Sequence, residues 1–299
     1  MATYMAFDIG GSGVKYARLN ENADFAAHGT IAPVPVAFDD LVDAMAGICE
    51  ELCPAGMDGI AISSPGTVDP KSGFAGGISM VPAIHQGSVK QALEARFGVP
   101  VSVENDANCV ALGEKWKGAA RDVTDALFVV IGSGIGGAVL RDGGLDRGTR
   151  FQAGEFGYML MPDAGGIRTW SEMASVRALA EQVCREKGVA AGSLDGKAVF
   201  AQAEQGDPIC CGAVNRFYEG LALGIYNLYY AFDPQAIFLG GAVSACPTLA
   251  EEIKRCWTRL FEHNGLVAPD LRIEACCFRG NANLIGALYA LLRLCEGKG

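Results

Sequence analysis

Apolar and polar positions alternate in short segments of this chain that flank glycine-rich turns. Residues 5–9 alternate before the glycines at 10–13, and the alternation resumes at 14–19. A period of two residues is typical of strands, so this segment predicts a hairpin with a glycine tip. The pattern returns at 127–141, again with glycines in the middle. Such a repeat predicts two lobes of the same architecture.

Apolar positions at helical spacing predict the helices of the chain. These helices lie at residues 38–52, 86–97, 105–117, 170–187, 198–205, 208–232, 247–263 and 283–294. Further buried strands are predicted at 59–64, 101–103, 236–239 and 271–278. Because strands and helices alternate, the pattern predicts an α/β fold in two lobes, with the first lobe ending near Lys117.

Composition excludes several classes of protein. The chain has 299 residues, of which 50% are apolar, yet no apolar run approaches the ~18 residues of a membrane span. We therefore expect a soluble protein with no membrane partner. Its first residues lack the features of a secretory signal, so we expect it in the cytoplasm. A net charge of −10 disfavours binding to nucleic acid, which requires clustered Lys and Arg.

The eleven cysteines occur without a C-x-x-C arrangement, which is typical of reduced thiols in the cytosol. Cys49 and Cys53 have a C-x-x-x-C spacing, but they lie in the helix predicted at 38–52, where buried cysteines are common. We therefore expect core residues at these positions rather than a metal site.

Three polar residues, Glu104, Asn105 and Asp106, lie where a predicted strand gives way to a helix. Asn and Asp are good helix caps, because their side-chain oxygens accept hydrogen bonds from free backbone N–H groups. Open α/β sheets also build their sites at the carboxyl ends of strands, where a carboxylate can act as a general base. This segment leaves both interpretations of Asp106 open.

The glycine turns suit either an ordinary hairpin or a phosphate site. Neither the Rossmann spacing nor the P-loop spacing is present. Glycine lets successive N–H groups approach an anion, Lys15 adds positive charge, and Asp8 can hold Mg²⁺ through water. Another strand ends in Gly240 and Gly241. This pair would let the flat base of a nucleotide lie against the backbone, but it equally suits a tight turn.

Five motifs, taken together and in this order, resemble those of the ROK family of sugar kinases. They are Asp8 to Lys15, Glu104 to Asn108, Gly132 to Gly137, Gly154 to Gly157 and Ile237 to Ser244. The set spans nearly the whole chain and is far more specific than any single motif. The resemblance implies an actin-like ATPase (ribonuclease H-like) fold with two lobes around a cleft for ATP and sugar. It also implies that the final helix returns to the first lobe, so the expected lobes are 1–117 with 284–299, and 118–283.

The resemblance further implies transfer of the γ-phosphoryl group of ATP to a sugar hydroxyl, usually O6, with Asp106 as general base. Such a transfer is catalysed mainly by positioning and charge stabilisation, which suits a carboxylate that accepts the proton late. The implied sugar-binding residues are Asn105, Glu155, Tyr158, Glu172 and Gly66. The implied ATP-binding residues are Asp8, which also holds Mg²⁺ through water, Gly10, Gly11, Ser12, Gly13, Lys15, Gly132, Ser133, Gly134, Gly136, Gly240 and Gly241. Glu172 can instead favour the positive end of a helix.

The chain departs from the family pattern where many members hold a structural zinc. Tyr158 stands at the position of a family His, and the loop at 161–169 has none of the three family cysteines. We therefore expect ATP and Mg²⁺ as cofactors and no zinc. Two classes of small-molecule acceptor remain open, namely free hexoses and β-glucosides, whose second ring requires a more open pocket.

A non-catalytic sugar sensor of the same family is the alternative. The sugar-responsive repressors carry an additional N-terminal DNA-binding domain, whereas this chain begins at its first predicted strand. The chain also keeps the carboxylate base and both glycine turns, which favours the kinase. A homodimer is common in the family and compatible with this sequence, but the sequence does not identify an interface.

Overall fold

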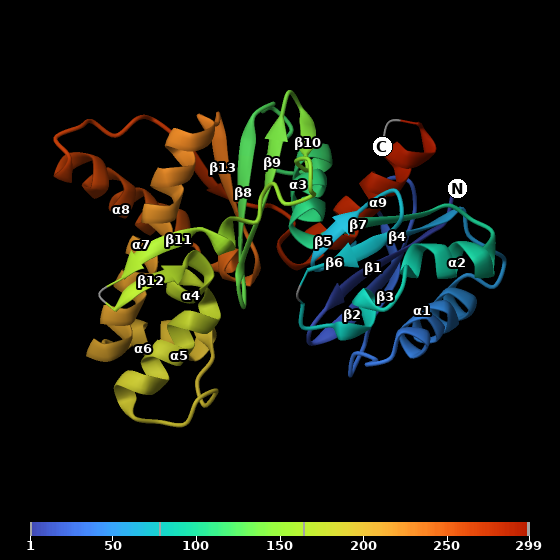
Figure 1. Ribbon diagram of the computed structural model, residues 1–299, viewed down its shortest axis with the longest axis horizontal. Coiled ribbons are helices and arrows are strands. Elements are labelled where there is room, and N and C mark those ends of the chain that lie inside the picture. The colour runs from blue at the N-terminus through green and yellow to red at the C-terminus, as the bar shows by residue number, and fades with distance from the viewer. Residues whose placement is uncertain (1, 78, 164, 298–299) are drawn as a thin grey trace. The chain divides into compact units, whose positions relative to one another are not determined.

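The computed structural model describes residues 2–77, 79–163 and 165–297. The chain forms two compact units, which Figure 1 draws as ribbons. The first unit comprises Met1–Arg121, Arg147–Gln152 and Gly280–Gly299, and the second comprises Asp122–Asp146 and Ala153–Arg279. Each unit contains a five-stranded sheet and a hydrophobic core of its own.

The sheet of the first unit has the strand order β3-β2-β1-β4-β7. Its strands are β1 (Tyr4–Gly10), β2 (Gly13–Leu19), β3 (Phe25–Ile31), β4 (Gly59–Ser64) and β7 (Val101–Asn105). β2 is antiparallel to both β1 and β3, whereas β1, β4 and β7 are parallel. The carboxyl ends of three parallel strands therefore meet at one edge of this sheet.

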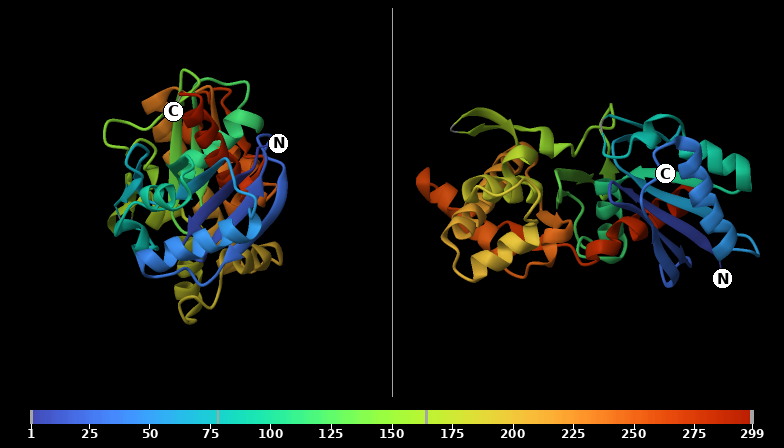
Figure 2. Two further views of the ribbon diagram at one scale, coloured as in Figure 1. Left: turned by 90° about the vertical axis from the view of Figure 1, so that its right-hand side faces the viewer. Right: turned by 90° about the horizontal axis from the view of Figure 1, so that it is seen from below.

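Helices cover both faces of this sheet (Figure 2). They are α1 (Phe38–Leu52), α2 (Val89–Phe97), α3 (Asp106–Lys117) and α9 (Ala282–Cys295). Met5, Phe7 and Ile9 of β1 pack into the core that includes α1 and α2. Ala6 faces the other way and packs with residues of α3 and α9. The alternation along β1 thus assigns its two faces correctly.

The sheet of the second unit repeats this topology in the order β10-β9-β8-β13-β14. Its strands are β8 (Ala126–Ile131), β9 (Ile135–Arg141), β10 (Gly144–Asp146), β13 (Ala236–Gly240) and β14 (Arg272–Ala275). β9 is antiparallel to β8 and β10, whereas β8, β13 and β14 are parallel. This match agrees with the predicted duplication.

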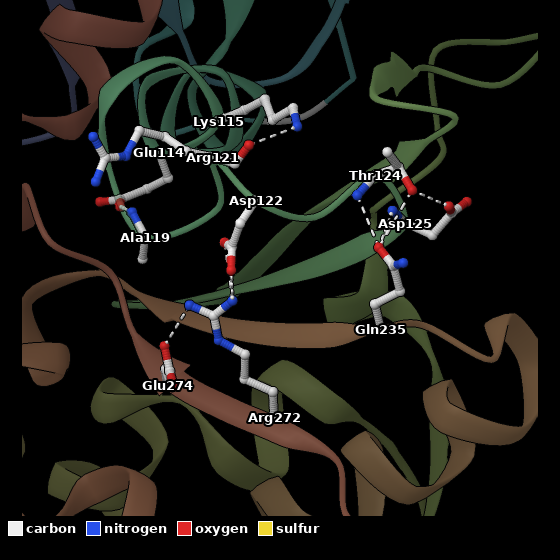
Figure 3. Close-up of polar contacts among 10 residues, drawn as sticks. All are labelled: Glu114, Lys115, Ala119, Arg121, Asp122, Thr124, Asp125, Gln235, Arg272 and Glu274. Atoms are coloured by element: carbon white, nitrogen blue, oxygen red, sulfur yellow. Dashed lines mark hydrogen bonds and ion pairs between the residues drawn. The ribbon is translucent and has the colours of Figure 1, made fainter.

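Polar side chains tie the beginnings of the parallel strands of the second unit together (Figure 3). Gln235, just before β13, accepts the backbone N–H groups of Thr124 and Asp125 through its Oε1, at 2.8 and 3.1 Å. Arg272 at the start of β14 pairs with both Asp122 and Glu274, each at 2.9 Å. These contacts hold the amino ends of β8, β13 and β14 in register.

The helices of the second unit are α4 (Trp170–Ala174), α5 (Val176–Lys187), α6 (Gly196–Glu204), α7 (Pro208–Phe232) and α8 (Leu249–His263). Trp170 at the start of α4 is fully buried and donates its indole N–H to the Gly220 carbonyl of α7 at 2.9 Å. A Cβ at Gly224 would lie 2.1 Å from the Trp170 ring, so this glycine makes room for the indole. Short α4 is thereby anchored to the long central helix.

The predicted helix at 170–187 is wrong, because the structure contains two helices there, α4 and α5. Ser175 between them is extended, and its hydroxyl accepts the N–H of Ala178 at 3.1 Å. This residue ends one helix and caps the next. The apolar spacing continues across the break, which is why the pattern alone does not reveal it.

Other boundaries differ by a few residues. A single 3₁₀ turn, η1 (Pro82–His85), precedes α2, which begins at Val89 rather than at 86. The strand predicted at 271–278 ends at Ala275. The pattern did not predict the short strands β3, β10, β5 (Thr67–Asp69), β6 (Phe74–Gly76), β11 (Leu160–Asp163) and β12 (Gly166–Thr169). Among the described residues, every helix falls short of what crossing a membrane requires.

The contact between α3 and α9 depends on two facing glycines. A Cβ at Gly286 would lie 1.7 Å from the carbonyl oxygen of Cys109. On the opposite helix, a Cβ at Gly113 would lie 2.9 Å from the carbonyl oxygen of Ala282. The backbones of the two helices therefore approach so closely that neither position has room for a side chain.

We expect Gly286→Ala to destabilise the protein by about 3 kcal/mol, because the new methyl group must push two backbones apart. The control is Gly47→Ala on the exposed face of α1, where no atom lies within 4 Å of the added Cβ. It should stabilise by about 0.5–1 kcal/mol, since Gly is a poor helix former. Thermal unfolding of both variants measures the two shifts. Shifts of the same sign would contradict this account of the helix contact.

Candidate active site

The residues predicted to carry chemistry in the first unit lie at the carboxyl edge of β1, β4 and β7. The register pairs Asp8 of β1 with Ser63 of β4, and Ser63 with Glu104 of β7. The next pair along the last two strands is Ser64 with Asn105. Three strands that are distant in sequence thus bring Asp8 and the polar run at 104–106 to one edge.

Asp8 is held by neighbours from three other elements. Its Oδ1 accepts the Ser63 hydroxyl at 2.8 Å, and its Oδ2 lies 3.7 Å from the ammonium nitrogen of Lys15. Burial raises the pKa of the Asp8 carboxyl, and the Ser63, Lys15 and Asn283 side chains offset only part of this rise. Asn283, from α9, also donates to the Ser63 hydroxyl at 3.2 Å. The carboxylate is therefore largely enclosed but well supported.

Glu104 is a buried carboxylate whose charge is neutralised by Arg147. The two side chains approach to 2.7 Å, and the Glu104 side chain is only 2% exposed. Its other oxygen, Oε1, accepts the side-chain amide of Asn108 and the backbone N–H of Asn105, both at 2.9 Å. Both oxygens thus have partners, so Glu104 supports this edge of the site. No sequence motif contains Arg147, which follows the short strand β10.

Asn105 and Asp106 form the junction between β7 and α3. Asn105 caps the helix, because its Oδ1 accepts the N–H of Asn108 at 3.0 Å, and its Nδ2 donates to the Gly66 carbonyl at 3.0 Å. Asp106 is the first residue of α3, and its Oδ1 accepts the N–H of Ala107 at 2.8 Å. Asn283 donates to the Asp106 carbonyl at 3.3 Å. The cap role therefore falls to Asn105, and the Asp106 carboxylate lies at the helix N-terminus.

The first glycine turn is the tip of the hairpin between β1 and β2. Gly10 and Gly13 are paired at the ends of the two strands, and Gly11 and Ser12 form the exposed tip. A Cβ at Gly11 would lie 2.8 Å from the Cβ of Met80, so the tip is in close contact with the segment that precedes η1.

The second glycine turn lies beside the start of α5. Its Gly132 donates a hydrogen bond to the Gly134 carbonyl at 2.8 Å and accepts one from the N–H of Val176 at 3.0 Å. Arg177 donates to the Ser133 carbonyl at 3.2 Å. The break in the helix predicted at 170–187 thus brings a helix N-terminus to this turn. Such an end carries partial positive charge, which suits an anion.

Gly241 lies directly against the same part of the sheet. Its φ is +85°, and a Cβ there would lie 2.2 Å from the carbonyl oxygen of Ile131. The turn that begins at Gly240 is therefore adjacent to the end of β8, and the sequence-predicted residues 132–134 and 240–241 lie together. Gly136 differs from them, because it lies within β9, paired with Val130, rather than in the turn.

Glu155 belongs to a loop that packs tightly on β9. A Cβ at Gly154 would lie 2.3 Å from the Gly137 carbonyl oxygen, and one at Gly157 would lie 2.0 Å from that of Ile135. Burial raises the pKa of the Glu155 carboxyl. Within the described residues, this carboxylate has no hydrogen bond or ion pair. Tyr158, three residues further on, has a 64% exposed side chain.

Glu172 stabilises the N-terminus of α4, which is the structural role that the sequence left open. It forms a capping box with Thr169, in which its carboxylate accepts the Thr169 N–H and hydroxyl at 2.9 Å each. These bonds lower the pKa of the exposed Glu172 carboxyl. Glu155 and Glu172 therefore differ, since the first carboxylate has no partner among the described residues and the second already has two hydrogen bonds.

A β-hairpin of β11 and β12 replaces the expected loop at 161–169. Met161 is buried against the core of the second unit, whereas Leu160 and Ile167 are 69% and 71% exposed. Among the residues that the structure describes, no three His, Cys, Asp or Glu side chains are grouped to hold a metal ion. The absence of zinc stays a prediction.

Comparisons with known proteins agree with the fold and the motifs. Residues 4–293 match the family described as the ROK family. A β-glucoside kinase of Listeria innocua is 37% identical over 295 residues, which cover 96% of this chain and 97% of that protein. The crystal structure of a ROK family protein from Streptococcus pneumoniae in complex with sucrose is 35% identical, covers 99% of each chain and has a TM-score of 0.87. A ROK family glucokinase from Streptomyces griseus, in complex with glucose and AMPPNP, is 26% identical, with 98% of this chain and 100% of that chain covered and a TM-score of 0.83.

The chain therefore belongs to the ROK family. The predicted actin-like ATPase fold and the predicted class, an ATP-dependent sugar phosphotransferase, are confirmed by these relatives.

We expect Glu155→Gln to raise the unfolding temperature at pH 7 by roughly 1–3 °C, because it removes a half-buried charge that lacks partners. Since the pKa of Glu155 is raised in the folded protein, its ionised form disfavours folding at neutral pH. This cost disappears as the pH falls through the raised pKa, so the difference from the wild type should shrink towards zero as the pH approaches the ordinary glutamate pKa of about 4.3.

The control is Glu172→Gln, for which the sign reverses. The pKa of Glu172 is lowered, so its ionised form favours the folded state, and the variant should unfold at a lower temperature than the wild type at pH 7. Thermal unfolding from pH 4 to pH 8 measures both shifts. Equal shifts for the two variants would contradict the difference in their surroundings.

Proposed function

We propose that this protein transfers the γ-phosphoryl group of ATP to the O6 hydroxyl of a β-glucoside, with Asp106 as general base. The observation that carries the proposal is the placement of the Asp106 carboxylate at the N-terminus of α3, next to Asn105, whose side chain is fixed on two sides. The similarity to a β-glucoside kinase over nearly the whole chain supports the choice of acceptor.

The proposed role of Asp106 is to orient the sugar hydroxyl and to accept its proton as the phosphoryl group transfers. A carboxylate suits this role, because phosphoryl transfer depends on alignment and charge stabilisation more than on a strong base. The Ala107 N–H donates to Oδ1, and the helix end adds partial positive charge beside the carboxylate.

Asn105 and Glu155 are the proposed ligands of the sugar hydroxyl groups. Each polar atom of the Asn105 amide makes one hydrogen bond to the protein and retains the capacity for another. The Glu155 carboxylate has two oxygens that can accept from adjacent hydroxyls, and the sugar would supply the partners that this half-buried group lacks. Gly66 and Tyr158 complete the proposed sugar site, whereas Glu172, already bonded in its capping box, would contribute through the hairpin that it anchors.

The proposed ATP site consists of the two glycine turns and the Gly240-Gly241 turn. The exposed tip at Gly11 and Ser12 and the turn at 132–134 beside the start of α5 offer backbone N–H groups to phosphates. Asp8 offers an oxygen donor of the type that Mg²⁺ prefers, and with a single such carboxylate the ion would be bound largely through water and phosphate oxygens. Bound in this way, Mg²⁺ would neutralise charge on the phosphates.

Preference for a β-glucoside over a free hexose would follow from the exposure of Tyr158 and of the β11–β12 hairpin. Tyr158, which stands in place of the family His, is mostly exposed. The segment at 161–169 that follows it forms the β11–β12 hairpin, which is anchored on one face only. A sugar bound at Glu155 would therefore leave its anomeric substituent uncrowded in the second unit, so a second ring could be accommodated.

An ADP-release assay with Mg·ATP and a panel of sugars tests the proposal. The panel comprises glucose, mannose, fructose, N-acetylglucosamine, N-acetylmannosamine, cellobiose and gentiobiose. We expect turnover with the β-linked disaccharides at a kcat/KM about tenfold or more above that for glucose. A preference for a free hexose would contradict the proposal that the acceptor is a β-glucoside. Sugar binding without any turnover would contradict the kinase and favour the sensor.

We expect Asp106→Asn to lower kcat by a factor of about 10³ or more, because the amide cannot accept the proton, while ATP affinity stays within about twofold. The matched control is Asp40→Asn, an exposed carboxylate in the first turn of α1. It should leave kcat unchanged. Loss of ATP affinity together with turnover in Asp106→Asn would indicate a structural role for this residue.

A further inference from the structure

His85 connects three segments of the first unit although no motif contains it. It is the last residue of η1, and both of its ring nitrogens have partners. Nδ1 lies 2.8 Å from the carbonyl oxygen of Ala75 in β6, and Nε2 lies 2.9 Å from the hydroxyl of Ser79. A carbonyl can only accept, so Nδ1 donates to Ala75. Nε2 faces the Ser79 hydroxyl, which also lies 3.2 Å from the Val81 carbonyl oxygen.

The strand that His85 holds is in contact with Gly66. Successive carbonyl groups of a strand point to opposite sides, so the Ala75 carbonyl faces His85 while the Gly76 carbonyl faces β5. A Cβ at Gly66 would lie 2.5 Å from the Gly76 oxygen and 3.6 Å from Cε1 of the His85 ring. Gly66, with its φ of +90°, therefore fits closely against β6 and lies near the imidazole.

Gly66 in turn fixes Asn105. Its carbonyl accepts the Asn105 Nδ2 at 3.0 Å, and the same side chain caps α3 immediately before Asp106. A continuous series of contacts thus runs from the His85 ring through β6 and Gly66 to the Asn105 amide, next to the proposed base. Loss of the His85 ring would release β6 and, with it, the surface against which Gly66 and Asn105 are held.

We propose that His85 is a positioning residue for the sugar, which keeps Gly66 and Asn105 in the arrangement that binds the acceptor. Because both ring nitrogens are engaged within the protein, His85 acts through these neighbours rather than by contact with the substrate. The proposal rests on the proposed sugar kinase activity and adds to it a determinant of acceptor affinity in the first unit, far in sequence from Glu155 and Tyr158.

The test compares three substitutions of His85 by steady-state kinetics in both substrates. His85→Ala removes both ring contacts and should raise the KM for the β-glucoside about tenfold, with the KM for ATP within about twofold of the wild type. His85→Asn places an amide near the position of Nδ1 and so can keep the bond to Ala75. His85→Asn should therefore bring the KM for the β-glucoside most of the way back to the wild-type value. His85→Gln, whose amide lies near the position of Nε2 and Ser79, should restore it less.

His28→Asn is the matched control, since His28 is an exposed residue of β3 in the same unit. It should leave both KM values unchanged. An unchanged sugar KM in His85→Ala would overturn the proposal. So would an equal rise in both KM values, which would indicate general damage, or the absence of any recovery in His85→Asn.

Failure of the proposed function is distinguishable from failure of this inference. If the wild-type protein does not turn over ATP with any sugar, the kinase proposal fails. Calorimetric titration with gentiobiose then takes the place of kinetics for the same variants. A dissociation constant that His85→Ala raises and His85→Asn restores would support the positioning role, and a constant equal in all variants would overturn it.

Discussion

The parallel register of β1, β4 and β7 holds the candidate site of the first unit together. It places Asp8, Ser63 and Glu104 side by side, and it brings Asn105 level with the end of β4. A slip of one residue between any two of these strands would turn their side chains to the opposite face of the sheet. Because helices pack on both faces, such a slip would exchange the small side chains that face α3 and α9 with the larger ones that face α1 and α2. The hydrophobic core thereby decides where the polar residues lie.

Charge pairing within the protein reinforces this edge. The Glu104 carboxylate is almost fully buried, and breaking such a pair by removing one partner typically costs about 3–5 kcal/mol. The partner, Arg147, arrives in a segment of six residues that packs with the first unit, although it lies in the sequence between two parts of the second. Glu104 in turn accepts from Asn105, which caps α3, and from Asn108 in the first turn of that helix. A single buried ion pair thus supports the junction that carries Asp106.

The second unit uses the same topology but supports its polar residues differently. Its turns are held by backbone contacts that only glycine permits, as at Gly154, Gly157 and Gly241. The two glutamates implied by the family resemblance illustrate the contrast. Glu172 is satisfied within its own capping box, whereas Glu155 is half-buried with a raised pKa and lacks a partner among the described residues. A carboxylate in that condition stabilises the fold poorly but is ready to bind a donor, as a ligand site requires.

Most of the architecture could be predicted from local pattern. The periods of two and of 3.6 residues located α1, β4 and α7 with correct bounds, because each has one continuous apolar face or buries nearly all of its residues. The five glycine-rich and polar motifs identified the family, since they depend on residue type and order alone. The break at Ser175 was missed, because a serine cap interrupts the backbone without changing the apolar spacing.

The partners of the motif residues could not be predicted in this way. Arg147 contacts Glu104 from 43 residues away, and Asn283 contacts Asp106 from 177 residues away. His85 lies 20 residues from Asn105 and reaches it only through β6 and Gly66. None of the three stands in a recognisable sequence pattern. Their contacts arise only when the sheet, α9 and the turn at η1 are packed around the strand ends. The type and spacing of residues along the chain thus specified the elements, the family and the candidate base. The hydrogen bonds that orient those residues depend on segments brought together by burial of apolar surface, and such long-range contacts leave no local signal in the sequence.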